Sequence, residues 1–238
     1  MNVYQLTERD QKEGLWYHRP SEGWPPPAIE TPDAYDGGSR LLFYCAGKDS
    51  RERRNRIRQW VEALPSMTNV RFLWVTGTLN QELLNGICNV PSVEGLRAKS
   101  SNVESLDAIW TVDHLRFVSI DNCTRIRSIA GVARAQNLVW LELENAKLIR
   151  DLGPIGHLTK LKGLAVRGSM WTTQVVESLS PLGGLTDLRY LGIENLRSTD
   201  GSLLPLFSLR ELRHFGHALW WPADEIATIR SHNPGLAA

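Results

Sequence analysis

The segment Leu138-Val-Trp-Leu141-Glu-Leu143 decides the fold of this chain, because its pattern of three spaced apolar residues recurs six more times. The other copies begin at Val70, Val93, Leu115, Leu161, Leu188 and Leu212, the last with His217 in the third apolar place. Successive copies start 22 to 27 residues apart, as from Val93 to Leu115 and from Leu161 to Leu188. A period in the low twenties with this spacing predicts a repeat solenoid with one short strand per repeat.

Residues 148–161 show how the chain returns between two strands. They read Leu-Ile-Arg-Asp-Leu-Gly-Pro-Ile-Gly-His-Leu-Thr-Lys-Leu, and residues 181–188 repeat the second half as Pro-Leu-Gly-Gly-Leu-Thr-Asp-Leu. This stretch resembles the short-repeat, internalin-like class of leucine-rich repeat proteins, in which x-I-x-D-I-x-P-L-x-x-L-T-x-L leads into the next strand. The resemblance covers residues 64–220. It implies an α/β fold, namely a right-handed leucine-rich repeat solenoid with a parallel concave β-sheet and short helices or 3₁₀ turns on the convex side.

Two features depart from the simplest form of this class. The ninth repeat position, where an Asn or Cys usually supports the turn, holds such a residue only at Cys123, so we expect less regular turns. The longest repeat, residues 161–187, has room for a helix at Gln174–Leu179.

The regions outside the repeats predict an arm and two end units. Residues 1–38 are polar and rich in Pro and Gly, and we expect them to form an N-terminal arm. Residues 39–238 then form one leucine-rich repeat domain. It opens with a strand–helix unit at 39–64, whose helix begins after Asp49. The repeats occupy 65–220, and a helical cap that starts near Pro222 occupies 221–238.

Composition and charge limit the classes of partner. The net charge of +1 at pH 7 gives no general attraction to nucleic acid or to an anionic membrane, so we expect neither as partner. No apolar run is long enough to span a bilayer, and the first ten residues lack the apolar centre of a secretion signal. Three widely spaced cysteines do not make a disulfide framework. We therefore expect a cytoplasmic protein that is monomeric when free.

The variable strand positions predict a binding surface on the concave face. Because side chains alternate along a strand, these positions point away from the core. Large aromatic residues and arginines are the usual anchors of protein interfaces. The predicted partner-binding residues are Phe72, Trp74, Arg97, Arg116, Phe117, Trp140, Glu142, Arg167, Tyr190 and Glu194.

The aromatic members of this set have two interpretations. An exposed aromatic stripe indicates a contact site for another protein. That protein would be bound by an inhibitor, such as a bacterial immunity protein that neutralises a toxin, or by an adaptor or scaffold. In the second interpretation the N-terminal arm, or crowding on a concave surface, covers the stripe within the same chain.

The basic segment 48–58 supports a different hypothesis. Its arginines would contact phosphate in a nucleic-acid or nucleotide binder. The same composition is typical of a solvated helix face, since a period of 3.6 residues distributes the arginines around the helix. The preceding Gly47-Lys-Asp-Ser50 loop lacks the G-x-x-x-x-G-K-[ST] spacing of a phosphate-binding loop.

The sequence indicates no catalytic or metal site. His214 and His217 are three residues apart in a strand and therefore lie on opposite faces, so they cannot bind one metal ion together. C-x-x-C and H-x-x-x-H pairs are absent, and Cys123 has no evident base. We expect no catalytic residue, no metal, no cofactor and no enzyme activity.

Overall fold

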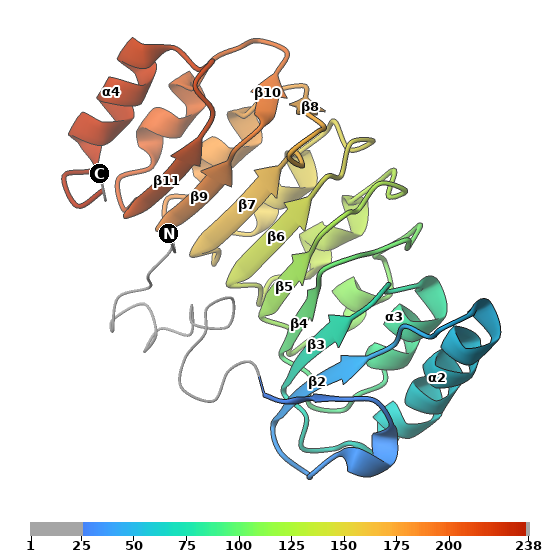
Figure 1. Cartoon of the computed structure of the whole chain (residues 1–238). Helices are drawn as coiled ribbons and strands as arrows, with labels where there is room; N and C mark the ends of the chain where they lie inside the picture. The colour runs from blue at the N-terminus through green and yellow to red at the C-terminus, as the bar shows by residue number, and fades with distance from the viewer. Residues whose placement is uncertain (1–25, 237–238) are drawn as a thin grey trace.

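Each predicted repeat contributes one short strand to a parallel sheet in the computed structural model, which describes residues 26–236 (Figure 1). The sheet has nine strands in the order β1-β2-β3-β4-β5-β6-β7-β9-β11, and every neighbouring pair is parallel. The strands are β1 (Ala28–Ile29), β2 (Arg40–Tyr44), β3 (Phe72–Thr76), β4 (Gly95–Ala98), β5 (Phe117–Ile120), β6 (Trp140–Glu144), β7 (Gly163–Arg167), β9 (Tyr190–Ile193) and β11 (His214–His217). The predicted leucine-rich repeat solenoid is confirmed.

The chain returns between strands on the convex side, behind the sheet in Figure 1. The returns from β2 to β3 and from β3 to β4 contain the helices α2 (Ser50–Ala63) and α3 (Gln81–Ile87). The later returns are 3₁₀ turns at Ile109–Thr111, Ala130–Arg134, Gly153–His157, Ser180–Gly184 and Leu204–Ser208, with two further turns at Pro32–Ala34 and Leu64–Ser66. Pro154, Pro181 and Pro205 are each the second residue of their turn, where a missing N–H costs no hydrogen bond.

The leucines of the repeats form one continuous core. Leu138, Leu141 and Leu143 are 0–2% exposed, and the same cluster runs from Leu41 near one end to Ile229 near the other. No single repeat could bury this row of side chains alone, so each one depends on its neighbours.

A helix packs at each end of the solenoid. Asp49 caps α2 by accepting hydrogen bonds from the Arg51 and Glu52 amides, and Trp60 of α2 stacks on Phe43 with ring centroids 4.2 Å apart. At the other end, α4 (Ala223–His232) follows Pro222, and the buried Asn233 attaches it to the last repeat. The Asn233 amide donates to two carbonyls and accepts from the amide of Leu212 at 2.9 Å.

The predicted helix at Gln174–Leu179 is wrong. The segment instead contains β8 (Gln174–Val176), which pairs in parallel with β10 (Leu196–Ser198) in a separate two-stranded sheet. Gln174 and Val176 are buried while Val175 is partly exposed, so the segment alternates with the period of a strand. The Gln174 side chain also donates a 2.7 Å hydrogen bond to the Ile149 carbonyl, which fixes the strand to the preceding repeat.

Asparagines shape three of the turns that leave the sheet. Asn122, Asn145 and Asn195 have φ of 58°, 55° and 50°, the left-handed region that asparagine tolerates better than most residues. They stand at the eighth repeat position, directly before the ninth. The turns after β5, β6 and β9 are therefore more alike than the ninth position alone predicts.

The structure describes only part of the predicted N-terminal arm. Residues 28 and 29 of the predicted arm form β1 beside β2, whereas its residues 1–25 lie outside the described residues.

Cys45, Cys88 and Cys123 are free thiols, and burial raises the pKa of Cys45 and of Cys88 to about 11. Within residues 26–236, no helix has the length and apolar character needed to cross a membrane.

The repeat phasing can be tested in the core. We expect Leu141→Ala and Leu164→Ala each to lower the free energy of unfolding by about 2–5 kcal/mol, because both side chains are fully buried. The control Lys147→Ala, at an exposed position, should change it by less than about 0.5 kcal/mol. Urea unfolding measures all three, and equal small losses would contradict the phasing.

Candidate functional site

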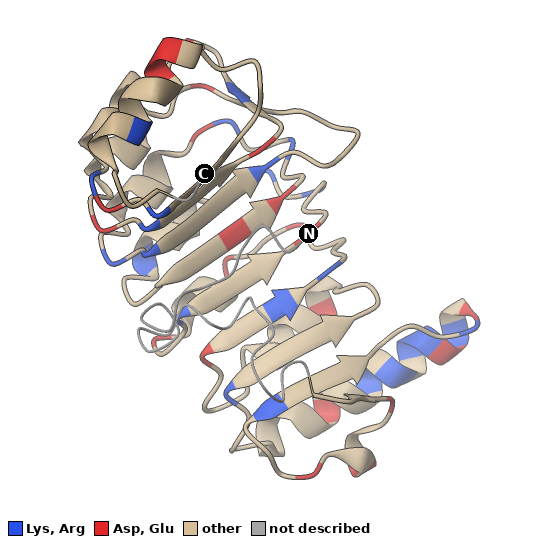
Figure 2. Ribbon diagram, turned by 60° about the vertical axis from the view of Figure 1, so that its left-hand side comes forward, with Lys and Arg blue, Asp and Glu red and all other residues tan. Residues whose placement is uncertain are grey.

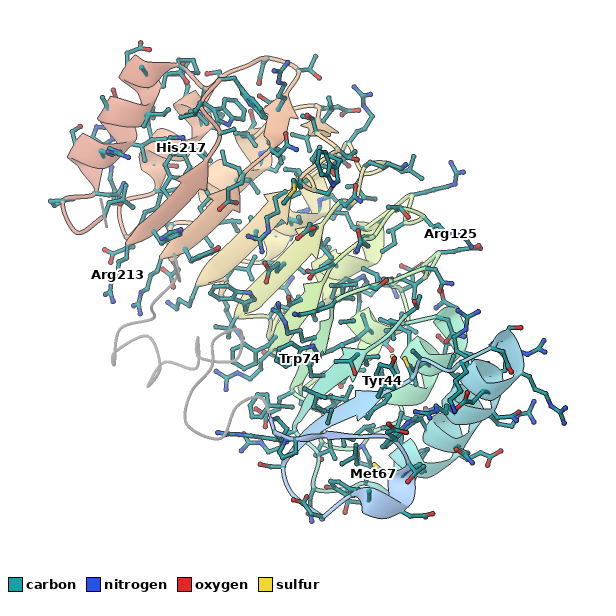
Figure 3. The ribbon with its side chains drawn as sticks, viewed as in Figure 1. Tyr44, Met67, Trp74, Arg125, Arg213 and His217 are labelled. Carbon is teal, nitrogen blue, oxygen red and sulfur yellow. The ribbon has the colours of Figure 1, made fainter. Side chains whose placement is uncertain are left out.

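The side chains between the core leucines form one continuous surface, which we call the concave face. The strands are paired so that equivalent repeat positions lie side by side and make straight rows across the sheet. Figure 3 shows Trp74 over β3, and Arg213 near the start of β11. Five spacings of about 4.8 Å make the face about 24 Å wide between β3 and β9.

The first row across the concave face is aromatic. We call Phe72, Phe117, Trp140 and Tyr190 the aromatic cluster. The rings of Phe72 and Phe117 have centroids 6.0 Å apart, and those of Trp140 and Tyr190 are 4.8 Å apart. His214 continues the row by stacking on Tyr190 at 4.8 Å.

Glycines allow these rings to meet across a strand. Gly95 lies between Phe72 and Phe117 in the row, and Gly163 lies between Trp140 and Tyr190. A Cβ on Gly163 would overlap the six-membered ring of Trp140, so the indole lies directly over this glycine. The pairs therefore approach closely although two strand spacings separate their backbones.

The aromatic cluster is buried, which differs from the expectation of an exposed stripe. Trp140 is 0% exposed and Phe117 1%, while Trp74 beside them is partly exposed. Ring contacts between residues two strands apart, from Phe72 to Phe117 and from Trp140 to Tyr190, contribute to this burial. A contribution from the N-terminal arm concerns residues 1–25, outside the described residues.

The second row holds a buried carboxylate, Glu142, on β6. Its Oε2 accepts a 2.8 Å hydrogen bond from Ser119, which in turn accepts from Arg97 at 3.1 Å. Arg167 forms an ion pair with the other oxygen, Oε1. We call these four residues the carboxylate centre. Glu142 is 1% exposed, and such a charge is tolerated only when cations and hydrogen bonds compensate for the lost water.

Two further acidic residues, Asp121 and Glu144, lie where β5 and β6 end. Burial raises the pKa of Asp121 against the effect of Arg97, Arg167 and Lys99, which lower it. Burial and the nearby Asp121 also raise the pKa of Glu144. The middle of the concave face thus combines one buried carboxylate that is paired with arginines and two carboxyl groups whose pKa is raised.

The rim of the concave face presents arginines that rest on the aromatic cluster. The guanidinium of Arg71 lies 5.6 Å from the ring centre of Phe72, and that of Arg116 lies 5.3 Å from Phe117. Glu94 bridges the two arginines, at 2.6 Å and 4.0 Å. The side chains of Arg71 and Arg116 stay 51% and 41% exposed, so this pair is both held in place and accessible.

The ten predicted site residues all come from β3 to β9 or the positions beside these strands. Arg97 joins two groups, because its guanidinium also lies 5.0 Å from the Trp74 ring centre. Arg167 reaches toward Glu194 at 4.0 Å, and Glu194 lies over Gly216, where a Cβ would overlap its carboxylate.

Sequence reasoning missed Ser119 and His214. The alignment of the repeats could have indicated both. It places Ser119 beside Glu142 of the next repeat, and His214 beside Tyr190. Within the described part of the chain, no group of three or more His, Cys, Asp or Glu side chains could hold a metal ion.

The role of Gly163 can be tested by adding one methyl group. We expect Gly163→Ala to lower the free energy of unfolding by about 1–3 kcal/mol, since the new Cβ would displace the Trp140 ring. Gly184→Ala is the matched control, because its Cβ would meet nothing within 4 Å. Urea unfolding that finds the two variants equal would show that Trp140 does not depend on this contact.

The raised pKa of Asp121 predicts that the stability of the fold depends on pH. A raised pKa means that the folded state holds the Asp121 proton at a pH where the unfolded chain has lost it, so stability falls as pH rises through that interval. We expect Asp121→Asn to raise the free energy of unfolding at pH 7. The gain should disappear below the ordinary Asp pKa of about 3.9. Urea unfolding at several pH values measures this, with the exposed Asp113→Asn as control; a gain independent of pH would contradict the assignment.

Solved structures with the same architecture include two internalins from Listeria monocytogenes. Internalin C2 matches with a TM-score of 0.55 and 20% identity, over 76% of this chain and 79% of that one. The internalin inlF matches with a TM-score of 0.52 and 16% identity, over 96% and 67%. Comparisons with protein-family models and with curated proteins gave no match. The described chain therefore has the leucine-rich repeat fold, in a form similar to that of the internalins.

Proposed function

We propose that this chain is a non-catalytic interaction module that binds the acidic surface of a partner protein across the concave face. The observation that carries the proposal is the accessible Arg71–Arg116 pair, which Glu94 and two phenyl rings hold in place. Arginine is enriched in protein interfaces, and a side chain that is already ordered loses less entropy on binding.

A row of basic positions extends this pair along the starts of the strands, where the ribbon in Figure 2 is coloured blue at Lys and Arg positions. Its members are Arg71, Arg116, Lys162, Arg189 and Arg213, with Glu94 as the acidic member. An acidic partner surface complements such a row, which accelerates association and selects against basic surfaces.

The buried aromatic cluster has a supporting role in this proposal. Its rings form the base on which the rim arginines rest, so Trp140 contributes to binding through the shape of the face. Removing the indole would destabilise the fold by about 3–5 kcal/mol, the range for a buried aromatic residue. Binding tests therefore use the accessible rim.

Within this class we favour an inhibitor, such as an immunity protein that neutralises a toxin. Residues 26–236 make up a single solenoid. When such a solenoid binds a partner, it covers part of the partner's surface, and this can block the partner's activity. An adaptor or scaffold would use the same face and would differ only in binding a second protein at the same time. A reducing, cytoplasmic location fits the three free thiols.

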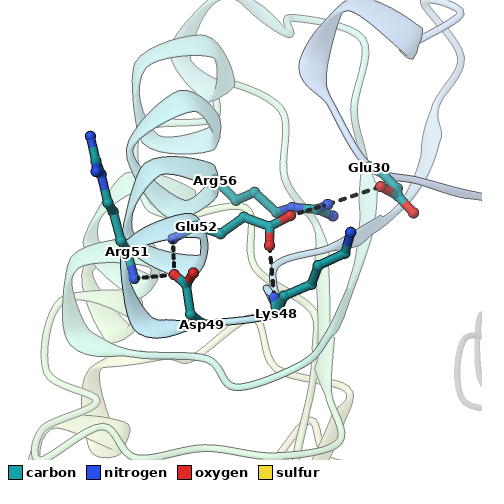
Figure 4. A network of polar contacts seen from close by, with 6 residues as sticks. All are labelled: Glu30, Lys48, Asp49, Arg51, Glu52 and Arg56. Atoms are coloured by element: carbon teal, nitrogen blue, oxygen red, sulfur yellow. Dashed lines mark hydrogen bonds and ion pairs between the residues drawn. The ribbon is translucent and has the colours of Figure 1, made fainter.

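The nucleotide-binding alternative is less well supported by the geometry of segment 48–58 (Figure 4). The Asp49 carboxylate accepts from the first amides of α2, and Glu52 accepts from the Lys48 amide at 2.8 Å. These amides would otherwise bind a phosphate. Arg56 is also engaged, because it pairs with Glu52 and Glu30 at 3.0 Å each. The exposed arginines Arg51, Arg53, Arg54 and Arg58 remain for a polyanion.

The test is affinity capture from native lysate with three baits. These are the unmodified chain, Arg71→Glu/Arg116→Glu on the concave rim, and Arg134→Glu/Arg210→Glu at exposed convex positions as a charge-matched control. We expect one protein to be recovered by the first and third baits and lost by the second. With that protein purified, the rim variant should weaken binding about tenfold or more.

Two outcomes would contradict the proposal. The first is equal recovery by the rim and convex variants. The second is binding to double-stranded DNA that falls steeply with salt and is abolished by Arg51→Glu/Arg54→Glu, which would assign the function to α2.

A further inference from the structure

Two turns beyond the carboxyl ends of the strands present apolar side chains to solvent. Met170 and Trp171 follow β7 and are 84% and 89% exposed. Leu219 and Trp220 follow β11 and are 96% and 42% exposed. Single exposed apolar residues are ordinary on a protein surface, but four within two turns on the same edge of the sheet form a patch. We call these four residues the carboxyl-edge patch.

The first turn is held rigidly by its backbone. Ser169 and Thr172 exchange two hydrogen bonds across it, at 3.0 Å and 3.4 Å, so Met170 and Trp171 occupy its tip. The Asn195 amide donates to the carbonyls of both Ser169 and Thr172, at 2.6 Å and 3.1 Å. A side chain presented from a fixed turn is already ordered for binding.

The second turn is attached to the same neighbour. Trp220 donates from its indole nitrogen to the Leu196 carbonyl at 3.0 Å, and the Arg197 guanidinium lies 4.6 Å from its ring centre. The segment 195–197 thus contacts one turn on each side. The turns are therefore about two strand spacings, roughly 10 Å, apart.

A hollow of about 250 Å³ opens beside the second turn, lined by Arg197, Ser198, Gly201, Trp220 and Trp221. Trp221 is buried and Trp220 is fixed, so the wall of the hollow is formed by ordered rings. The carboxyl-edge patch therefore combines a protruding indole, Trp171, with an aromatic recess on the same edge.

The exposed area and the charges favour a second copy of this chain as the occupant. The four side chains expose on the order of 600 Å² per chain, and two copies that covered all of it would bury about 1,200 Å², the lower limit of a standard stable interface. Both signs of charge lie at the recess, since Arg197 lines it and the exposed Asp200 accepts a hydrogen bond from Ser198, which also lines it. A twofold interface uses the same surface of both copies, so a border with both signs of charge lets the arginine of one copy face the aspartate of the other. The mixed charge does not suit an anionic membrane, which attracts clusters of basic residues.

We propose that the carboxyl-edge patch is the interface of a symmetric homodimer, in which Trp171 of each copy enters the recess beside Trp220 of the other. This proposal revises the expectation of a free monomer. It is independent of the proposed function, because the dimer would use the edge of the sheet and leave the concave rim accessible.

Sedimentation velocity of the full chain over a dilution series tests the proposal. We expect twice the monomer mass of 26.8 kDa at high concentration, with dissociation on dilution. Trp171→Ser/Leu219→Ser should raise the dimer dissociation constant about a hundredfold or more, because two central anchors are removed. Leu204→Ser, at a 60% exposed position on the convex side, is the matched control and should dimerise normally.

The test distinguishes folding from assembly. Both side chains of the double variant are exposed, so its midpoint of urea unfolding, measured at a concentration where the unmodified chain is monomeric, should be unchanged. Arg71→Glu/Arg116→Glu should dimerise like the unmodified chain. A monomer at every concentration, or a dimer that survives Trp171→Ser/Leu219→Ser, would overturn the proposal.

Discussion

Every repeat of this chain carries an inward row of leucines that can be buried only against the rows of its two neighbours. The parallel strand pairing fixes the distance between repeats, and the leucines fill the space behind it. This dependence explains why the ends differ from the middle. The first core layer is covered by α2 through Trp60 and Phe43, and the last by α4, which Asn233 attaches.

The same pairing determines what the concave face can be. Because equivalent positions align across the sheet, the outward residues form rows, and the composition of a row sets its packing. The aromatic row contains a glycine between Phe72 and Phe117 and another between Trp140 and Tyr190, and the second lets the Trp140 indole lie over the sheet. The adjacent row concentrates charge in the carboxylate centre. A buried Glu142 with arginines on both sides costs solvation energy, and it resists any rearrangement that would leave one charge unpaired.

Much of this structure was predictable from the sequence, for reasons that particular residues make clear. The leucine spacing predicted each repeat strand, and Asp49 and Pro222 predicted where the end helices begin. The segment after Thr173 was predicted wrongly, because the choice of a helix considered only the length available and ignored the alternation of Gln174, Val175 and Val176. The asparagine turns were not predicted, because the residues that adopt a positive φ stand at the eighth repeat position and the family pattern points to the ninth.

The burial of the aromatic cluster could not be inferred from one repeat at a time. Whether Trp140 faces solvent depends on Gly163 and Tyr190, which are 23 and 50 residues away in the chain. The ten predicted residues do lie on one face, but the sequence pattern could not separate the accessible arginines from the buried rings. That separation depends on side-chain directions, which follow only from the assembled sheet.

The shortness of β1 has a consequence for solubility. A solenoid sheet is open at both ends, and an unpaired end strand is a template on which a second molecule can add strands in register. Strand β2 is five residues long, whereas β1, which covers its outer side, has only two. At this edge of the sheet, β1 therefore offers an incoming strand only a few backbone groups for hydrogen bonding. By pairing with Leu42 and Phe43, Ala28 and Ile29 thus replace the middle of a five-residue edge with a two-residue edge, which is less favourable for the addition of strands from a second molecule.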